Sequence, residues 1–425
     1  MSCSPWLRWL SFVCYCCTFW LQSPSTASSL AFISSHSNLH RKRSASSLRQ
    51  EPHQQEENIQ VFDAPKECPY SMRFSPQRIN LTRPKKLPRN NILGLPSFFP
   101  GRRSRFEQAI SCERLEWCEE TDGLALLARL FHTAATAAEN NLVMAFPDAS
   151  SYSLLHNAVE ILGPYAPQWD LQIIWGPLPH MKFTKTLNSD SANNNQHDRA
   201  WVDSETHQRR TQAWVQRLLV THGICPYTRT DTKSGQGISG VPVAPIAYSA
   251  TPATSLLEIV SVALTTIQHD MLDVGPEQTS SILLAAPEFD SRLEEWSGPF
   301  FSILQACIVA VSLTDTIGVV CFHPEYKVSD GQTWPGFGHM HSVPKLQQLT
   351  DIESWDEAAA GGAWQRRTPH ATLNVLWAPQ LALAEKQRKT TSLYRENIRK
   401  LVHGIGVENL QIDLERERRL FEIVE

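Results

Sequence analysis

The chain has 425 residues, of which 42% are hydrophobic and 19% are charged, and its formal net charge is −4. This composition is typical of a globular protein with a sizeable core, and the length leaves room for two or three domains. The slightly negative charge gives no reason to expect nucleic-acid binding, which depends on clustered positive charge.

The N-terminal segment differs from the rest because the first acidic residue is Glu51. An apolar run, Trp9–Leu21, has the length of a signal-peptide core and is too short to cross a bilayer as a helix. We therefore predict a signal peptide over residues 1–30, and no membrane span in the mature chain.

A second targeting signal is predicted directly after the first. The Ser-rich, basic stretch that follows Ala31-Phe32 resembles the transit part of the two-part plastid address of algae with complex plastids. Residues 31–64 are therefore predicted to be transit-like and disordered. We expect import into the plastid (chloroplast) stroma, with secretion as the alternative.

Four of the ten cysteines belong to the predicted signal peptide. The others are widely spaced and form no Cys-x-x-Cys pair, which disfavours a structural zinc site and a dense disulfide framework. A reducing stroma suits this spacing. These cysteines are Cys68, Cys112, Cys118, Cys225, Cys307 and Cys321.

Regular structure is predicted to begin beyond a basic arm. Residues 68–106 contain nine Arg or Lys residues and no acidic residue, and we interpret them as an extended, solvated connection rather than a site for phosphates or anionic lipid. Apolar periodicity and turn residues predict a first α/β unit over residues 65–186. Its elements are a helix capped by Thr121 over 122–140, a buried strand over 141–146, a helix over 150–162 and a buried strand over 171–175.

Residues 187–208 are rich in Asn, Ser, Asp and Gln and are predicted to form a linker. A second α/β unit is predicted over 209–410, and a charged tail with the pattern of a solvated helix over 411–425. The elements of the second unit are strands over 241–248, 281–286 and 316–322 and helices over 254–269, 300–313, 371–386 and 393–403.

The two halves share a sequence order. Each opens with Cys-Pro-Tyr and a hydroxyl residue, Cys68–Ser71 and Cys225–Thr228, and each has a strand ending in Pro plus an acid, a helix, and a strand ending in Pro. We therefore predict an α/β fold of two related β-α-β-α-β units in tandem, the first degenerate and the second extended by C-terminal helices. The alternative is two unrelated units, because β-α-β units resemble one another widely.

Polar groups follow the last strand of the second unit, and they mark the candidate site. In α/β proteins, ligands usually bind where strands end. His323 and Glu325 are candidate acid/base groups, since a strand-end histidine can titrate near neutral pH. Cys225 is a candidate catalytic thiol or ligand.

The predicted ligand-binding residues are Tyr326, Arg367 and His370, with Arg367 as the anchor of an anion. Metal binding is a weaker prediction. His323, His339 and His341 have donor atoms that divalent metals accept, but their spacing does not define a ligand set, and hydrogen-bonding histidines are the simpler interpretation. The sequence assigns no cofactor.

Four ordered motifs of the second unit resemble one protein family. They are Trp214 before Cys225-Pro-Tyr227, Phe322-His-Pro-Glu-Tyr326, Arg367-Thr-Pro-His-Ala371 and Tyr394-Arg-Glu-Asn397-Ile398. Over about residues 214–406 the chain is thereby similar to the domain-of-unknown-function 1415 proteins of bacteria and plastid-bearing organisms. The chain departs from the family pattern where His370-Ala371 replaces Tyr-Pro, and where Asn374 and Trp377 replace a histidine and an arginine. The resemblance implies no reaction.

The leading hypothesis is a plastid-imported, soluble enzyme that acts on a small anionic molecule, with His323 as acid/base or ligand. One alternative is a non-catalytic plastid scaffold or assembly factor, which the degenerate first unit favours. Another is metal or cofactor handling through the histidines and Cys225. A small-molecule ligand is expected, nucleic acid is not, and protein partners are not predicted.

Overall fold

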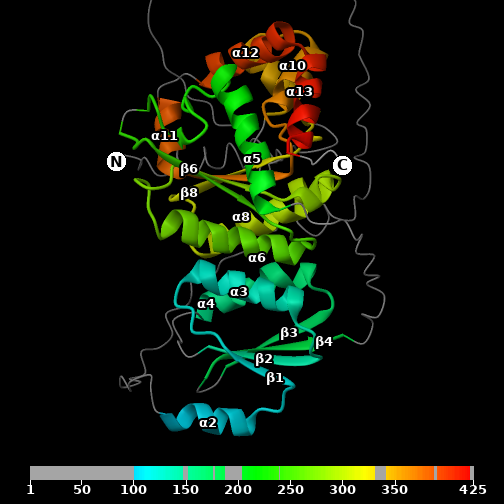
Figure 1. Ribbon diagram of the computed structural model, residues 1–425. Helices are drawn as coiled ribbons and strands as arrows, with labels where there is room; N and C mark the ends of the chain where they lie inside the picture. Colours follow the sequence, from blue (N-terminus) through cyan, green and yellow to red (C-terminus); the bar gives the residue numbers. More distant parts are fainter. Residues whose placement is uncertain are drawn as a thin grey trace, which may run out of the picture. The chain divides into compact units, whose positions relative to one another are not determined.

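The computed structural model describes residues 100–146, 152–175, 178–186, 203–238, 240–330, 341–386 and 390–421, which all belong to one compact unit of the chain (Figure 1). The fold is mixed α/β, with two mixed sheets of four and five strands. The predicted α/β class is confirmed. The predicted leader, transit-like segment and Cys68 motif lie outside the described residues.

The first sheet has the strand order β1-β2-β4-β3. β1 and β2 are parallel, and β4 runs antiparallel to both β2 and β3. Helix α3 connects β1 to β2, and α4 connects β2 to β3. The elements, after helix α2 (Pro100–Ala109), are β1 (Arg114–Trp117), α3 (Gly123–Thr136), β2 (Asn141–Ala145), α4 (Tyr152–Leu162), β3 (Trp169–Ile174) and β4 (His180–Lys185).

The second sheet has the order β5-β6-β7-β9-β8. β6 and β7 are parallel, and β9 runs antiparallel to both β7 and β8. Its elements are β5 (Lys233–Ser234), β6 (Ala244–Ala250), α6 (Leu256–Ile267), β7 (Ser281–Ala285), α7 (Leu293–Glu295), α8 (Phe301–Ala310), β8 (Ile317–Phe322) and β9 (Thr372–Trp377).

The two sheets also share their register at one edge. Ala145 of β2 pairs with the last residue of β1 and the first of β4, and Ala285 of β7 pairs with the last residue of β6 and the first of β9. The next backbone hydrogen bonds match as well: Phe146 N–H donates to Pro179 O (2.9 Å), and Ala286 N–H donates to Ala371 O (2.7 Å).

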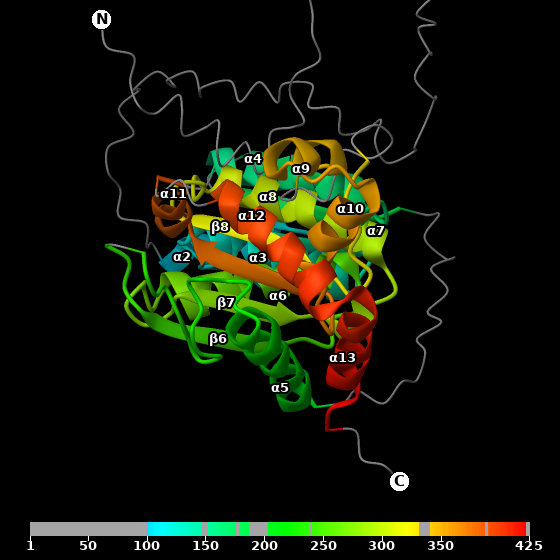
Figure 2. The same cartoon turned by 90° about the horizontal axis from the view of Figure 1, so that it is seen from above.

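Helix α5 and several of the later helices cover the second sheet on its outer face. Side chains of α5 and of the turns and helices near the C-terminus form an apolar cluster with Ile246, Leu283 and Phe322, and α12 lies over the strands when seen from above (Figure 2). The remaining helices are α5 (Ser204–Trp214), continued by a π-helical turn (Val215–Thr221), α9 (Val343–Thr350), α10 (Trp355–Trp364), α11 (Ala378–Lys386), α12 (Thr390–Arg399), a π-helical turn (Lys400–Ile405) and α13 (Val407–Arg419).

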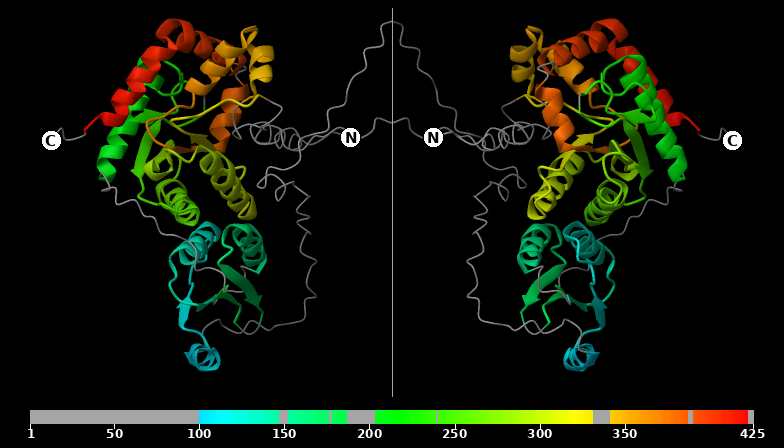
Figure 3. Two further views of the ribbon diagram at one scale, coloured as in Figure 1. Left: turned by 90° about the vertical axis from the view of Figure 1, so that its right-hand side faces the viewer. Right: turned by 90° about the vertical axis from the view of Figure 1, so that its left-hand side faces the viewer.

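The inner face carries the larger core. One apolar cluster contains side chains from both sheets and from α3, α4, α6 and α8, because α3 packs against α6 and α4 against α8 (Figure 3). β7 is buried at all five residues, as expected for a strand covered on both faces, whereas β3 alternates between covered and exposed residues.

Most predicted elements are confirmed, and three predictions need correction. The helix predicted over 371–386 is wrong for Thr372–Trp377, which form β9 between β7 and β8. Leu373, Val375 and Trp377 alternate into the inner core, so sheet pairing outweighs the weak helical pattern. The cap of α3 is Asp122 rather than Thr121, since Asp122 Oδ1 accepts from Leu124 N–H (2.8 Å).

The third correction concerns strands and a helix start that were not predicted. β1 and β4 are short and rich in charged residues, and charges on one face hide the strand pattern. Helix α5 begins at Ser204, inside the range predicted as linker, where Asp203 caps it through Thr206 N–H (2.9 Å). The C-terminal helix is confirmed as α13, with Leu410 and Leu414 buried. Within the described part of the chain, no helix has the length and apolarity needed to span a membrane.

Candidate functional site

The candidate site lies at one edge of the second sheet. β6, β7 and β8 point in one direction, so their carboxyl ends meet the beginning of β9 at the same edge. His323 N–H donates to Arg366 O (3.1 Å), which joins the turn after β8 to the segment before β9. Ligands of α/β folds bind most often at such an edge.

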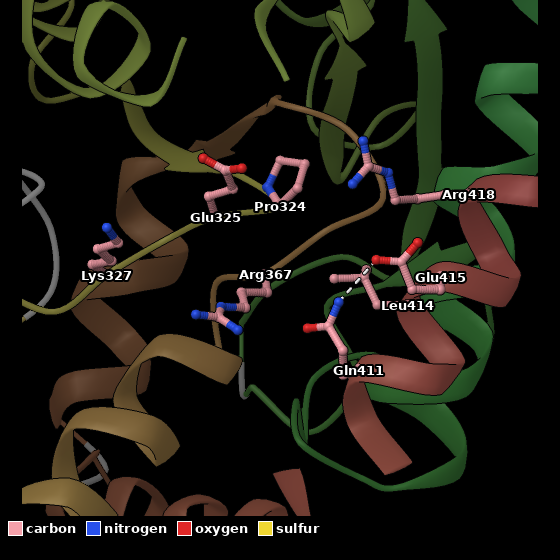
Figure 4. Close-up of a pocket in the computed structure, with 8 residues that line it drawn as sticks. All are labelled: Pro324, Glu325, Lys327, Arg367, Gln411, Leu414, Glu415 and Arg418. Atoms are coloured by element: carbon pink, nitrogen blue, oxygen red, sulfur yellow. Dashed lines mark hydrogen bonds between the residues drawn. The ribbon is translucent and has the colours of Figure 1, made fainter. Parts of the chain in front are cut away.

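A pocket of about 400 Å³ opens beside this edge (Figure 4). Its walls come from three separate segments: the turn after β8, the segment before β9, and helix α13. The lining residues are Pro324, Glu325, Lys327, Arg367, Gln411, Leu414, Glu415 and Arg418.

Three cations and two carboxylates face this pocket, and its positive charges are only partly compensated. Among the described residues, no salt bridge joins Lys327 or Arg367 to a carboxylate. Arg367 Nε donates to Tyr326 O (3.2 Å), and its guanidinium lies 4.6 Å from the centre of the Trp364 ring. Burial lowers the pKa of Arg367, while nearby Glu325 opposes that shift. A half-buried guanidinium with spare N–H donors favours an anion.

His323 lies behind the pocket and does not line it. The side chain is fully buried. Its Nε2 contacts Phe289 O (3.0 Å), and its Nδ1 accepts from Glu325 N–H (3.0 Å). Burial lowers the pKa of His323. These bonds fit a neutral imidazole protonated at Nε2, which holds the turn that presents Glu325 to the pocket.

A buried hydrogen-bond network of Asp290, His370 and His207 lies next to His323. His370 Nδ1–H donates to Asp290 Oδ2 (2.9 Å), and Asp290 Oδ1 accepts from Ala371 N–H (2.7 Å). His370 Nε2 and His207 Nδ1 form the next hydrogen bond (3.0 Å). Burial is the main cause that lowers the pKa of His207 to about 4, so His207 is neutral at pH 7. Hydroxyls of Thr368 and Thr372 both donate to His370 O, at 2.6 and 2.8 Å.

Arg418 connects this hydrogen-bond network to the pocket. It lines the pocket, and one of its terminal nitrogens lies 3.6 Å from Asp290 Oδ2. Helix α13 is held nearby by a two-pronged ion pair, in which Arg217 Nε and a terminal nitrogen contact the Glu417 carboxylate at 2.6 and 2.8 Å. The ion pair of Glu417 thus holds α13 where Arg418 reaches both Asp290 and the pocket.

Cys225 and Tyr326 lie in a different environment. Thr228 Oγ1 donates to Cys225 Sγ (3.4 Å), and burial raises the pKa of the thiol. Tyr326 is almost completely buried, and burial raises the pKa of its phenol. Neither side chain lines the pocket. The structure thus brings Glu325 and Arg367 together at the pocket, places His323 and His370 behind it, and separates Cys225 and Tyr326 from it.

The predicted metal ligands do not form a cluster in the described part of the chain. His339 lies outside the described residues. His341 is partly buried, which lowers its pKa, and its ring centre is 5.7 Å from that of Tyr394. Where the structure describes the chain, no group of three His, Cys, Asp or Glu side chains could hold a metal ion.

Sequence reasoning did not find four residues of this region: His207, Asp290, Lys327 and Arg418. Asp290 had a signal, because it follows the Pro that ends β7 and so belongs to a strand end. His207 stood in the predicted linker, and Arg418 in a run of charges that resembles a solvated helix face. The contacts of His207 and Arg418 with this region can be recognised only in the folded structure.

Comparison with known proteins now adds one finding. Residues 206–335 match the family model described as a protein of unknown function (DUF1415), so the chain carries a DUF1415 domain there and the predicted resemblance is confirmed. The matched segment contains His207, Asp290, His323 and Glu325, and it ends before Arg367 and α13. No curated protein and no solved structure matches the chain.

Proposed function

We propose that the C-terminal unit is an enzyme that binds a small anionic molecule in the pocket at the edge of the second sheet. The observation that carries this proposal is the meeting of Arg367, Lys327 and Arg418 in one pocket. Three cations from three separate segments are kept together against their mutual repulsion, and an anionic ligand would offset that repulsion.

The residues take distinct roles in this proposal. Arg367 anchors the anion, because its guanidinium can donate two parallel hydrogen bonds to a carboxylate or phosphate. Glu325 acts as the acid/base group, since it is the carboxylate on the strand-end turn that lines the pocket. His323 positions Glu325 through the Glu325 N–H bond rather than touching the ligand.

Anion binding is tested with inorganic phosphate as the probe and isothermal titration as the measurement. Arg367→Gln should weaken phosphate binding about tenfold, because a charge-assisted hydrogen bond contributes on the order of 1.5 kcal/mol. The exposed Arg399 lies away from the pocket, so Arg399→Gln should leave affinity unchanged. Equal affinity of the wild type and Arg367→Gln, or no phosphate binding by either, contradicts the proposal.

The enzymatic role is tested in cells that lack the protein. Glu325→Gln should fail to restore the deletion phenotype, whereas Glu415→Gln, which changes the other pocket carboxylate, should restore it. Complementation by both variants would leave anion binding as the function and remove Glu325 from catalysis.

We also propose that the two α/β units are related copies and that the first is structural. Support comes from the strand order, strand directions and edge register, which β1-β2-β4-β3 shares with β6-β7-β9-β8, leaving out the short strand β5. By that register Trp175 corresponds to His323, since each follows the strand residue that pairs with the first residue of the next strand. A purely structural first unit favours a second candidate function, that of a non-catalytic scaffold. Affinity purification that recovers a stoichiometric protein partner and no retained small molecule would support the scaffold over the enzyme.

Import into the plastid is proposed from the two-part N-terminal signal alone. A fluorescent protein fused to residues 1–64 should accumulate in the plastid, and the same fusion with Phe32→Ala should stop before the stroma. Secretion of the first fusion would contradict the proposal.

A further inference from the structure

Helices α3 and α6 have the same pattern of burial, although they belong to different units. Asp122 caps α3, and Ser255 caps α6 with a capping box that includes Glu258. Counted from these caps, every buried residue of α6 has a buried counterpart in α3. The two helices therefore present equivalent faces to the core.

These equivalent faces pack against each other. Ser261 Oγ donates to Ala128 O (2.8 Å), and both residues stand six positions after their caps. Both are small and buried, which lets the helices approach closely. Helix α4 also packs against α8, and these helices are equivalent as well, because α4 joins β2 to β3 and α8 joins β7 to β8, which hold matching places in the two sheets.

A contact in which equivalent positions meet is the mark of a two-fold, isologous interface. In a symmetric dimer, a residue on the axis meets its own copy, and here Ala128 meets its counterpart Ser261. The first unit thus covers the second with the same elements that a second copy would use.

We propose that the face of the C-terminal unit formed by α6 and α8 is a self-association surface, and that the first unit occupies it as a built-in second copy. The surface is apolar, since buried residues such as Leu257, Val260 and Leu264 lie in the core shared by the two units. Without the first unit, this face would expose a continuous apolar patch, and the complementary partner would be the same face of another chain. The proposal does not depend on the chemistry of the pocket.

The test uses the full chain with Ala128→Arg, which places a guanidinium in the contact and separates the units. Sedimentation equilibrium should then show concentration-dependent pairing of chains beyond the wild-type state. Adding Ser261→Arg should abolish that pairing, because position 261 would meet itself across the new interface. The matched control Ala128→Ser should behave as the wild type.

Two results would overturn the proposal: chains of Ala128→Arg that stay unpaired while far-UV circular dichroism remains native, or pairing that persists with Ser261→Arg. If Ala128→Arg does not fold, the double variant Ala128→Cys/Ser261→Cys decides. Oxidation should link the two cysteines within one chain, as mapped by peptide mass spectrometry, and neither single variant should give this link. A link between chains, or none, contradicts the arrangement.

Discussion

Apart from the added strand β5, the second sheet has the strand order and edge register of the first, and a charged pocket lies at the edge of the second sheet. In the first unit, β3 passes to β4 within residues 175–179, and the position equivalent to His323 is Trp175. In the second unit, the chain between β8 and β9 includes α9, α10 and Arg367. The shared strands provide the frame, and the inserted segments provide the chemistry.

The two sheets also differ in how helices cover them. The second sheet is packed on both faces, by α6 and α8 on one side and by α5 and the C-terminal helices on the other. That outer layer brings Arg418 of α13 and His207 of α5 to the strand edge. A site with buried titratable groups needs such a layer, because burial is what shifts the pKa of His207 and His323.

The largest difference between the two sheets should come from removing Asp290, whose carboxylate accepts hydrogen bonds at the strand edge of the second sheet. Asp290→Ala leaves the buried N–H groups of His370 and Ala371 without their acceptor. We expect a loss of about 2–5 kcal/mol in the free energy of unfolding, measured with urea. The exposed Asp170 on β3 of the first sheet is the control. Asp170→Ala should change stability by less than about 0.5 kcal/mol. Equal effects of the two substitutions would show that the hydrogen bonds of Asp290 do not add to the stability of the second sheet.

Sequence patterns predicted the core helices and several central strands of both sheets well, because these elements have clear apolar patterns. Helices α3, α4, α6 and α8 and strands β2, β7 and β8 have apolar residues at helical or strand spacing. The pattern failed for β9, whose pairing partners β7 and β8 are distant in sequence. It also failed for β1, where Arg114 and Glu116 form an ion pair on the strand.

The candidate site was harder to predict for a related reason. Glu325 and Arg367 could be proposed, since they belong to motifs beside strand ends. Cys225 shares those motifs but lies apart from the pocket, because motif order along a chain does not fix distance in space. Arg418 and His207 contact residues that are far away in sequence, and local sequence patterns do not predict such contacts.

The buried His207 predicts a difference in pH dependence between the two units. The folded-state pKa of His207 is about 4, below the ordinary histidine value of 6.5. The unfolded chain therefore binds more protons between these values, so stability is full above pH 6.5 and falls as pH drops toward 4. Because one pKa unit corresponds to about 1.4 kcal/mol, the loss should be on the order of 2–3 kcal/mol.

His207→Gln removes the titrating group and should flatten this part of the stability profile, measured by urea unfolding between pH 4 and pH 7. The neighbouring charges that remain are Asp203 and Arg210 of the α5 region and Asp290. His132, exposed on α3, is the control in the first unit. His132→Gln should leave the slope unchanged, and an unchanged slope in His207→Gln would show that His207 does not change its protonation state on unfolding.

The smallest expected effect separates two arginines of helix α13. Arg418 lines the pocket and approaches Asp290, whereas Arg416 is exposed and pairs with Asp413. Arg418→Gln should weaken phosphate binding about threefold to tenfold, because its charge is shared with Asp290 and partly screened by solvent. Arg416→Gln should have no effect beyond a small change in long-range attraction, which added salt removes. Equal losses at low salt that both vanish at high salt would mean that phosphate senses only the general charge of α13. A loss confined to Arg418 and retained in salt would instead identify a direct contact, and with it the edge of the second sheet as the place where the two units differ in chemistry.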